Sequence, residues 1–575
     1  MENQSGNHFS RSRNVGRNMI FGYINRCFSL LLPFIVRTVV IYRFGVLYLG
    51  MNSLLSSIFQ MLNLAELGFG AAVVYSLYRP VAEGDTDTVC AYLGTYRQIY
   101  RVIGLVILTA GMAVMPFFPN LLRGQTVPAG MDIFSWYIIF LADAVLSYLL
   151  FGYKTAIPSA LQRNDLLSRV DTVVLIGKST VQIIFLLLTD NFYYYLLTSL
   201  GFTVLRNFLV SRLVERYYPQ YVCRGRIDAA QFRELKRLVG GLALSKFRGA
   251  SRHMIDSLCI TVFVSLAMTA VYSNYFLILT SVTSLFGIIG ASMVASVGNS
   301  IVTENVEKNY RDMRRFNFMY MLLAGWAVIC MLCLYQPFVR LWVGSDLMLG
   351  MPEVVALCLY FYVLKMGDLR WIYFEGAGLW WKARFIVIAE IIANIVLNLL
   401  LAKYWGVLGI ILATLISLFF INFIGEAWIL FKEYFKNGRL STFFADQALY
   451  FGVTVVLAVA CLQACVMIGL PCIEVGHDAL QAATGAAKVA GVNAVNGASA
   501  SATGGVATAG ATAIVNGAAN PGQSKLFALA GLAARLLLCT LIVVAGYYLS
   551  YRWTERYREA KEWLWSRYRG MWREG

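Results

Sequence analysis

Five ionisable side chains lie within one apolar stretch, residues 240–266, that is long enough to cross a bilayer. They are Lys246, Arg248, Arg252, His253 and Asp256. At about 100° per residue, Arg248, Arg252 and Asp256 fall within about 80° of one another on a helix. A cation near the middle of a membrane helix costs roughly 2.5–3.5 kcal/mol on insertion scales, so a cluster of cations there requires a reason. We predict that this helix lines a polar cavity in which Lys246, Arg248 and Arg252 bind an anion.

An alternative interpretation is that the first cations of this stretch extend their side chains to the inner head groups. That interpretation suits Lys246 and Arg248, which lie near the start of the span. Arg252, by contrast, lies about 18 Å into a span that begins at Gly240, close to the middle of a core roughly 30 Å thick. Asp256 follows one turn deeper and is a candidate counter-ion or ion-coupling group.

The first apolar stretch repeats this pattern of charge within a span. Arg26 and Arg37 are eleven residues apart, which places them about 20° apart on a helix, and Pro33 lies on the same side. Proline frees a backbone carbonyl, which membrane helices tolerate where they line a cavity. We predict that both arginines bind substrate, although Arg37 lies near the outer end and also fits an interfacial anchor.

The second apolar stretch carries polar residues that complete the predicted site. Asn52 either joins helices by hydrogen bonds or lines the cavity, and we include it among the substrate-binding residues. Glu66 is a candidate counter-ion for Arg26 or a proton site. At an offset of 222 residues, Asn274 matches Asn52 and Arg248 matches Arg26. Unless these matches arose by chance, they indicate a repeat of six spans per half and add Asn274 to the substrate-binding residues.

The composition predicts an all-α polytopic membrane protein. The chain has 575 residues, of which 59% are hydrophobic, and a mean hydropathy of +0.64. Apolar stretches of sufficient length predict about fourteen transmembrane helices. They cover residues 18–42, 46–78, 98–120, 131–153, 171–189, 192–211, 240–266, 269–300, 317–338, 352–374, 385–402, 406–430, 446–470 and 525–550.

Positive charge is distributed unevenly between the two sets of connections. With the N-terminus placed in the cytoplasm, the inner connections and ends hold 32 of the 48 lysines and arginines, and the outer connections hold 6. This asymmetry predicts that both termini are cytoplasmic. The net charge of +17 therefore reflects topology, and we expect no nucleic-acid partner.

The order of spans and connections predicts five regions. Residues 1–211 form an N-terminal six-helix bundle, 212–239 a basic cytoplasmic linker, and 240–436 a C-terminal six-helix bundle. Two extra helices follow in 437–551, with an Ala/Gly-rich extracytoplasmic loop at 471–524 whose composition is typical of disorder. The tail at 552–575 mixes tryptophan and tyrosine with arginine and lysine, which predicts an amphipathic helix on the inner leaflet or, alternatively, against a partner.

Enzyme motifs are missing from the sequence. It contains no P-loop, GxSxG or HExxH, and the long outer loop offers few groups for catalysis. The three histidines and eleven cysteines show no spacing typical of a metal site or of a disulfide framework. We therefore expect no catalytic residues, no cofactor and no metal, although an integral-membrane glycan polymerase remains an alternative.

Long sequence patterns resemble bacterial polysaccharide-repeat-unit flippases of the Wzx type, members of the multidrug/oligosaccharidyl-lipid/polysaccharide (MOP) superfamily. The resemblance begins with RNMIFGYINRCFSLLLPFIVRT and YLGMNSLLSSIFQMLNLAELGFGAAVVYSLYRPVAEGD, and continues through VYSNYFLIL to ASVGNSIV. Asp256, Asn274 and Gly298–Asn299 stand at the expected places, and the similarity covers roughly Arg17–Lys436. The Ala/Gly-rich loop departs from the family pattern.

This resemblance implies two six-helix bundles around a central cavity and export of an undecaprenyl-diphosphate-linked oligosaccharide. It also implies membrane lipids and glycan polymerase machinery as partners. A cationic cavity suits a diphosphate, because arginine offers paired donors to phosphate oxygens and lysine a point charge. Two alternatives stay open: a cation-coupled drug antiporter of the same superfamily, which would favour an acidic cavity, and a lipid-linked peptidoglycan-precursor flippase.

Overall fold

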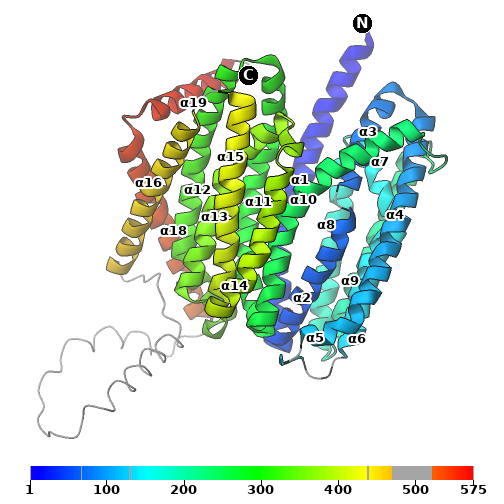
Figure 1. Ribbon diagram of the computed structural model, residues 1–575. Helices are drawn as coiled ribbons and strands as arrows, with labels where there is room; N and C mark the ends of the chain where they lie inside the picture. Colours follow the sequence, from blue (N-terminus) through cyan, green and yellow to red (C-terminus); the bar gives the residue numbers. More distant parts are fainter. Residues whose placement is uncertain are drawn as a thin grey trace, which may run out of the picture. The chain divides into compact units, whose positions relative to one another are not determined.

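The computed structural model describes residues 2–66, 68–122, 124–128, 130, 132–436, 439–468 and 521–573. Within these residues all regular secondary structure is helical (Figure 1). The predicted Ala/Gly-rich loop 471–524 lies outside them up to residue 520, as do the side chains of Lys246 and Arg248. The prediction of an all-α polytopic membrane protein is confirmed.

The chain folds into two compact units. The first unit consists of residues 1–276 and 380–417. Its helices are α1 (Glu2–Phe44), α2 (Val46–Leu62), α3 (Phe69–Glu83), α4 (Thr86–Val114), α5 (Phe118–Leu121), α6 (Ile133–Leu149), α7 (Ala156–Ala160), α8 (Asn164–Leu188), α9 (Tyr193–Tyr217), α10 (Ala229–Phe263), the start of α11 (Leu266–Thr303), and α14 (Arg384–Ile416).

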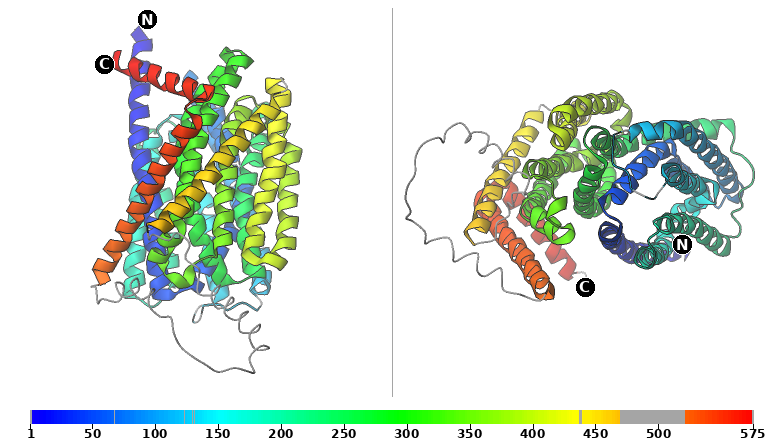
Figure 2. Two further views of the ribbon diagram at one scale, coloured as in Figure 1. Left: turned by 90° about the vertical axis from the view of Figure 1, so that its left-hand side faces the viewer. Right: turned by 90° about the horizontal axis from the view of Figure 1, so that it is seen from below.

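The second unit consists of residues 277–379 and 418–575. Its helices are the rest of α11, α12 (Val306–Val343), α13 (Met351–Gly376), α15 (Ile424–Leu430) between π-helical segments Ser417–Phe423 and Phe431–Phe435, α16 (Leu440–Met467), α18 (Pro521–Tyr551) and α19 (Glu555–Arg573). Helices α12, α16 and α18 pack against one another, and α19 runs across the end of α18 (Figure 2). Helix α19 covers most of the predicted amphipathic tail.

The two units divide the chain differently from the predicted bundles. Helix α10 and α14 belong to the first unit, whereas the sequence places both in the C-terminal bundle, residues 240–436. The predicted linker 212–239 is also largely helical. Asp228 begins α10 as a capping box, accepting a hydrogen bond from the backbone N–H of Gln231 while the Gln231 side chain accepts from the backbone N–H of Asp228. The irregular part of the linker is therefore short.

The helices coincide with the predicted spans, but not all of them are apolar enough to count as spans by themselves. In the described part of the chain, eight helices are long and apolar enough to cross a membrane, or up to nine if the bent pair Ile133–Leu149 and Gly152–Ala160 forms one span. Predicted spans at 192–211, 240–266 and 352–374 correspond to α9, α10 and α13, which carry charged residues. The count of fourteen stays a prediction.

Helix α14 is a hairpin of two antiparallel helical arms. Asn394 donates a hydrogen bond from Nδ2 to Oγ1 of Thr414 over 2.9 Å. In a straight helix, residues this far apart in sequence would be separated by about 30 Å. The chain reverses at Gly406, whose φ of 54° lies in the left-handed region that favours glycine. The separate spans predicted at 385–402 and 406–430 fit these two arms.

The two arms of α14 approach closely at Gly409. A Cβ at this position would lie 2.2 Å from the backbone oxygen of Leu401. We expect Gly409→Ala to destabilise the protein by about 1–3 kcal/mol, because the arms must move apart. Thermal unfolding of the purified protein measures the effect. Gly452→Ala is the matched control, since no atom lies within 4 Å of the added Cβ. Equal stability of the two variants would contradict the close approach.

Candidate functional site

A cavity of about 170 Å³, lined by both polar and apolar side chains, lies within the first unit, between α1, α2, α8 and α9. Two cations line it, Arg37 from α1 and Lys178 from α8, and its described lining contains no aspartate or glutamate. The remaining lining residues are neutral: Pro33, Val36, Val40, Leu49, Asn52, Leu175, Ser179, Gln182, Phe192 and Tyr195. A basic cavity with amide and hydroxyl groups suits an anionic, hydrogen-bonding ligand.

The geometry of Arg37 is fixed from α11. Its Nη1 donates to Oγ of Ser273 over 3.1 Å and to Oδ1 of Asn274 over 3.0 Å. Both acceptors are buried, and Oγ of Ser53 on α2 donates to Oγ of Ser273 over 3.1 Å. The structure thus brings together three predicted substrate-binding residues, because Asn274 orients Arg37 and Asn52 shares its cavity. All these acceptors are neutral, so they leave the positive charge of Arg37 uncompensated.

Lys178 lines the cavity but is not among the substrate-binding residues predicted from the sequence. Within the described residues its ammonium forms no hydrogen bond and no ion pair. Asp143 interacts with it electrostatically but is not ion-paired, and Oδ1 of Asp143 is buried without a hydrogen-bond partner. The sequence does contain a sign of this role, because Lys178 is a single lysine inside an apolar span.

Two other intramembrane cations, Arg206 and Lys365, are neutralised within the protein. Arg206 donates to Asp171 over 2.7 Å, and Lys365 donates to Asp368 over 2.6 Å. Such internal ion pairs satisfy the expectation for buried charge and need no ligand. Lys178 differs from them in lacking an ion pair among the described residues.

Arg26 lies on α1 but does not line the cavity that Arg37 lines. Its side chain is half-buried, and among the described residues its guanidinium has no hydrogen bond or ion pair. Arg26 is therefore a further cation of the first unit, besides Arg37 and Lys178, with no ion pair among the described residues. It does not pair Arg26 with Glu66.

Glu66 is held by tyrosines. Its carboxylate accepts from the hydroxyl of Tyr100 over 2.5 Å and from that of Tyr148 over 2.9 Å. Tyr96 continues the chain by donating to the hydroxyl of Tyr100 over 2.8 Å. The carboxylate forms no ion pair with a described cation, so the predicted role as counter-ion for Arg26 finds no support in this geometry.

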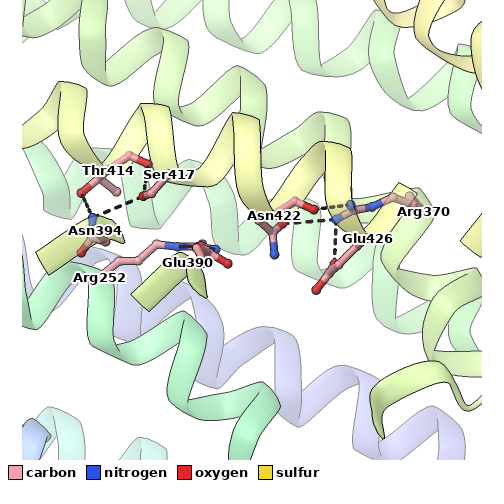
Figure 3. Close-up of polar contacts among 8 residues, drawn as sticks. All are labelled: Arg252, Arg370, Glu390, Asn394, Thr414, Ser417, Asn422 and Glu426. Atoms are coloured by element: carbon pink, nitrogen blue, oxygen red, sulfur yellow. Dashed lines mark hydrogen bonds and ion pairs between the residues drawn. The ribbon is translucent and has the colours of Figure 1, made fainter. Parts of the chain in front are cut away.

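Arg252 is engaged in a buried ion pair with Glu390 on α14 (Figure 3). Its Nε donates to Oε1 of Glu390 over 2.8 Å, and Nη2 contacts the same oxygen. Both side chains are almost fully buried. The sequence pattern predicts Asp256 as the counter-ion and does not single out Glu390. The sequence could have indicated Glu390 as a buried polar residue. Glu390, Asn394 and Asn398 recur every four residues, which places them on one face of an apolar span.

Asp256 is a buried carboxylate surrounded by neutral donors. It accepts from Oγ1 of Thr414 over 2.8 Å, from Nδ2 of Asn398 over 3.1 Å and from the hydroxyl of Tyr272 over 3.4 Å. Among the described residues, Asp256 forms no ion pair with Arg252, because Arg252 pairs with Glu390. Oδ1 of Asn398 is buried next to this carboxylate without a hydrogen-bond partner. These oxygens form a polar site that a proton or a small cation would neutralise.

The backbone of α10 carries Lys246 and Arg248 as well, but their side chains lie outside the described residues. Their predicted roles stay predictions.

Arg370 in the second unit has a structural explanation. It is 2% exposed and donates to Oε2 of Glu426 over 2.9 Å and to the backbone oxygens of Asn422 and Phe423 (Figure 3). These carbonyls lie in the π-helical segment Ser417–Phe423, where the hydrogen-bonding pattern of the backbone differs from that of an α-helix. Arg370 therefore satisfies buried backbone groups and a buried acid.

No protein-family model matches the sequence. No curated protein matches it significantly either. Solved structures, however, resemble the fold.

An inward-facing multidrug resistance MATE family transporter of the MOP superfamily matches with a TM-score of 0.56 at 14% identity, covering 73% of this chain and 96% of that one. The lipid II flippase MurJ in an inward closed conformation matches with a TM-score of 0.54 at 13% identity, covering 93% of this chain and 98% of MurJ. A mutant of the Vibrio cholerae MATE transporter VcmN matches with a TM-score of 0.52 at 15% identity, covering 76% of this chain and 100% of that one. The chain is thus a multi-pass membrane protein whose fold resembles those of the MATE transporters and of MurJ.

Proposed function

We propose that this protein is a flippase that moves an undecaprenyl-diphosphate-linked oligosaccharide from the inner to the outer face of the bacterial cytoplasmic membrane for polysaccharide synthesis. The observation that supports this most directly is the cavity of the first unit, where Arg37 and Lys178 face a space whose described lining holds no acid. Phosphate oxygens are the natural partners of such cations. The sequence resemblance to Wzx-type flippases supports the same substrate class.

The size of the cavity supports a fit to one part of the substrate. Pockets that enclose a drug-sized ligand usually measure about 300–1,000 Å³, and this cavity measures about 170 Å³. It is suited to a phosphate group or a sugar ring, with Asn52, Ser179 and Gln182 as hydrogen-bonding groups. We place the diphosphate here, with the polyprenyl chain in the lipid.

Two observations bear on the alternatives. A cation-coupled drug antiporter requires a cavity that attracts organic cations, whereas Arg37 and Lys178 repel them. A lipid-linked peptidoglycan precursor shares the diphosphate and is favoured by the fold likeness to MurJ, which extends over 93% of this chain. The precursor flippase is therefore the second candidate. The fold neighbours are transporters and a flippase, which supports a non-enzymatic role over a glycan polymerase.

Reconstitution tests the proposal directly. Proteoliposomes containing the purified protein would carry one of three substrates. The undecaprenyl-diphosphate oligosaccharide and the lipid-linked peptidoglycan precursor are incorporated in the membrane, and the organic-cation dye is supplied in the aqueous phase. We expect protein-dependent translocation of the oligosaccharide lipid, measured by its exposure to an impermeant sugar-oxidising reagent. Transport of the precursor alone would favour the second candidate, and transport of the dye alone would overturn the flippase proposal.

Transport would proceed by alternating access, with export of the anion favoured by the inside-negative potential. Each negative charge expelled gains about 2.3 kcal/mol per 100 mV. We place ion coupling at Asp256, whose carboxylate has only neutral hydrogen-bond donors in the structure.

Asp256→Asn is expected to abolish dependence of transport on a proton or sodium gradient while leaving the part driven by membrane potential. The amide cannot gain or lose the charge that coupling requires. Flipping in proteoliposomes with imposed gradients measures this dependence. Glu66→Gln is the control, because Glu66 was the other candidate and its carboxylate is held by tyrosines. Loss of gradient dependence in the control alone would reassign the coupling site.

We infer the orientation of the chain from its charge distribution, and a separate experiment tests it. With both termini cytoplasmic, reporter fusions at Gly84, between α3 and α4, and at Asp228, before α10, should report the cytoplasm. A fusion at Gly130, between α5 and α6, should report the outside. A reversed signal at Asp228 would contradict the proposed span count.

A further inference from the structure

Five cysteines of the second unit converge from three helices. Cys330 and Cys333 lie on α12, Cys461 and Cys465 on α16, and Cys539 on α18. The spacings of three and four residues place each pair on one face of its helix. All five side chains are buried, and no cysteine of the described residues is in a disulfide.

The sulfur atoms are close enough to share one ion. The Sγ atoms of Cys333, Cys465 and Cys539 all lie within 4.8 Å of one another. Cys461 also lies within hydrogen-bonding range of Cys539, which makes Cys539 the centre of the cluster. Three sulfurs around an ion at about 2.3 Å are separated by about 4.0 Å in a trigonal arrangement, so movements below about 1 Å close the site.

The helices that carry these thiols are fixed in register by close packing. A Cβ at Gly325 would lie 2.1 Å from the hydroxyl of Tyr547 and 2.7 Å from Oγ1 of Thr454, so α12 contacts both α18 and α16 there. Trp326 donates from Nε1 to Oγ1 of Thr540, the neighbour of Cys539, over 3.1 Å. The cluster is therefore preorganised by residues on all three helices.

We propose that Cys333, Cys465 and Cys539 form a binding site for a soft d¹⁰ metal ion, Cu(I), with Cys461 as an additional sulfur near it. All donors are sulfur, which selects soft ions over magnesium or calcium. Each thiol that binds the ion exchanges its S–H bond for an S–Cu bond and releases its proton to water. Structural zinc sites are almost always four-coordinate, whereas the described cysteines offer three sulfurs within 4.8 Å of one another, so the cluster fits Cu(I) better than Zn(II).

Such a site would tie the two C-terminal helices to the rest of the second unit. Helices α16 and α18 are separated in sequence by the long segment 469–520, which lies outside the described residues. An ion ligated from α12, α16 and α18 would join them through metal–sulfur bonds rather than through the chain. This inference is independent of what the protein transports.

The test is anaerobic titration of the purified full-length protein with Cu(I) in the presence of a competing chelator. We expect about one copper retained per chain after desalting, with three sulfur neighbours at about 2.3 Å in X-ray absorption spectra. Cys539→Ala should weaken Cu(I) binding by at least about tenfold. Cys358→Ala is the matched control, because Cys358 is equally buried in the second unit but lies on α13, outside the cluster.

Several results would overturn the site. They are equal copper retention by Cys539→Ala and Cys358→Ala, nitrogen or oxygen coordination in the spectra, or zinc retained where copper is not. Formation of a Cys333–Cys539 disulfide on mild oxidation, with no copper bound under reduction, would likewise replace the metal site by a redox pair. If the Cys539→Ala protein is not monodisperse, Cys465→Ala serves instead, because it removes a sulfur from a different helix. The X-ray absorption spectra of the unmodified protein test the site without any variant.

Discussion

Replacing Arg252 by alanine is expected to destabilise the protein by roughly 3–5 kcal/mol, because the buried carboxylate of Glu390 loses its cation. Removing a cation from a membrane helix also eases insertion by roughly 2.5–3.5 kcal/mol. The unpaired acid nevertheless remains, with Oε2 of Glu390 already lacking a hydrogen-bond partner. Thermal unfolding in detergent and abundance in the membrane measure the loss.

The double variant Arg252→Met with Glu390→Met is the matched comparison. Replacing both partners of a buried ion pair by apolar residues of similar size is often neutral, so we expect most of the stability to return. Transport by the double variant then reports whether Arg252 also binds substrate. Recovery by Arg252→Ala with Asp256→Ala instead would restore the pairing that the sequence suggested and contradict the structure.

Lys178→Gln is expected to reduce transport about ten- to a hundred-fold while the protein folds and accumulates normally. A hydrogen bond to a charged group contributes about 1.5–3 kcal/mol, which corresponds to this range. The lysine has no ion pair in the described structure, so its removal leaves no buried acid that was paired with it. Arg37→Gln should act in the same direction, and Arg37→Lys should retain part of the activity because a paired donor becomes a point charge.

The matched control for these cavity variants is Arg43→Gln on the same helix as Arg37. Arg43 is exposed and pairs with Asp190 over 2.8 Å, and such surface pairs contribute about 0–1 kcal/mol. Flipping in proteoliposomes, normalised to protein abundance, separates the variants. Full transport by Lys178→Gln and Arg37→Gln together would remove the cavity from the mechanism. Uptake of organic cations gained by Lys178→Glu would instead favour an antiporter.

The helical framework was predictable from the sequence. Apolar stretches of about twenty residues leave the backbone no partners other than its own, so their length alone predicts helices. Even the hairpin of α14 was predictable as two spans, because a lysine and an aromatic pair interrupt the apolar pattern before Gly406. The same cost of burying charge identified Arg26, Arg37, Arg252 and Asp256 as residues that require a reason.

Only the tertiary structure identifies the interaction partners of these buried charges, because ion pairs and hydrogen bonds depend on which helices become neighbours. Arg252 and Asp256 are one turn apart, which made them natural partners, but α14 brings Glu390 to Arg252 and Thr414 to Asp256. Lys178 lines the cavity because α8 packs beside α1, α2 and α9, and none of the described acids forms an ion pair with it. The cysteines show the same limit, since the spacing within each helix was visible but the convergence of α12, α16 and α18 was not. Helical periodicity fixes the face of each residue, whereas contacts between distant segments are fixed only by the packing of the helices.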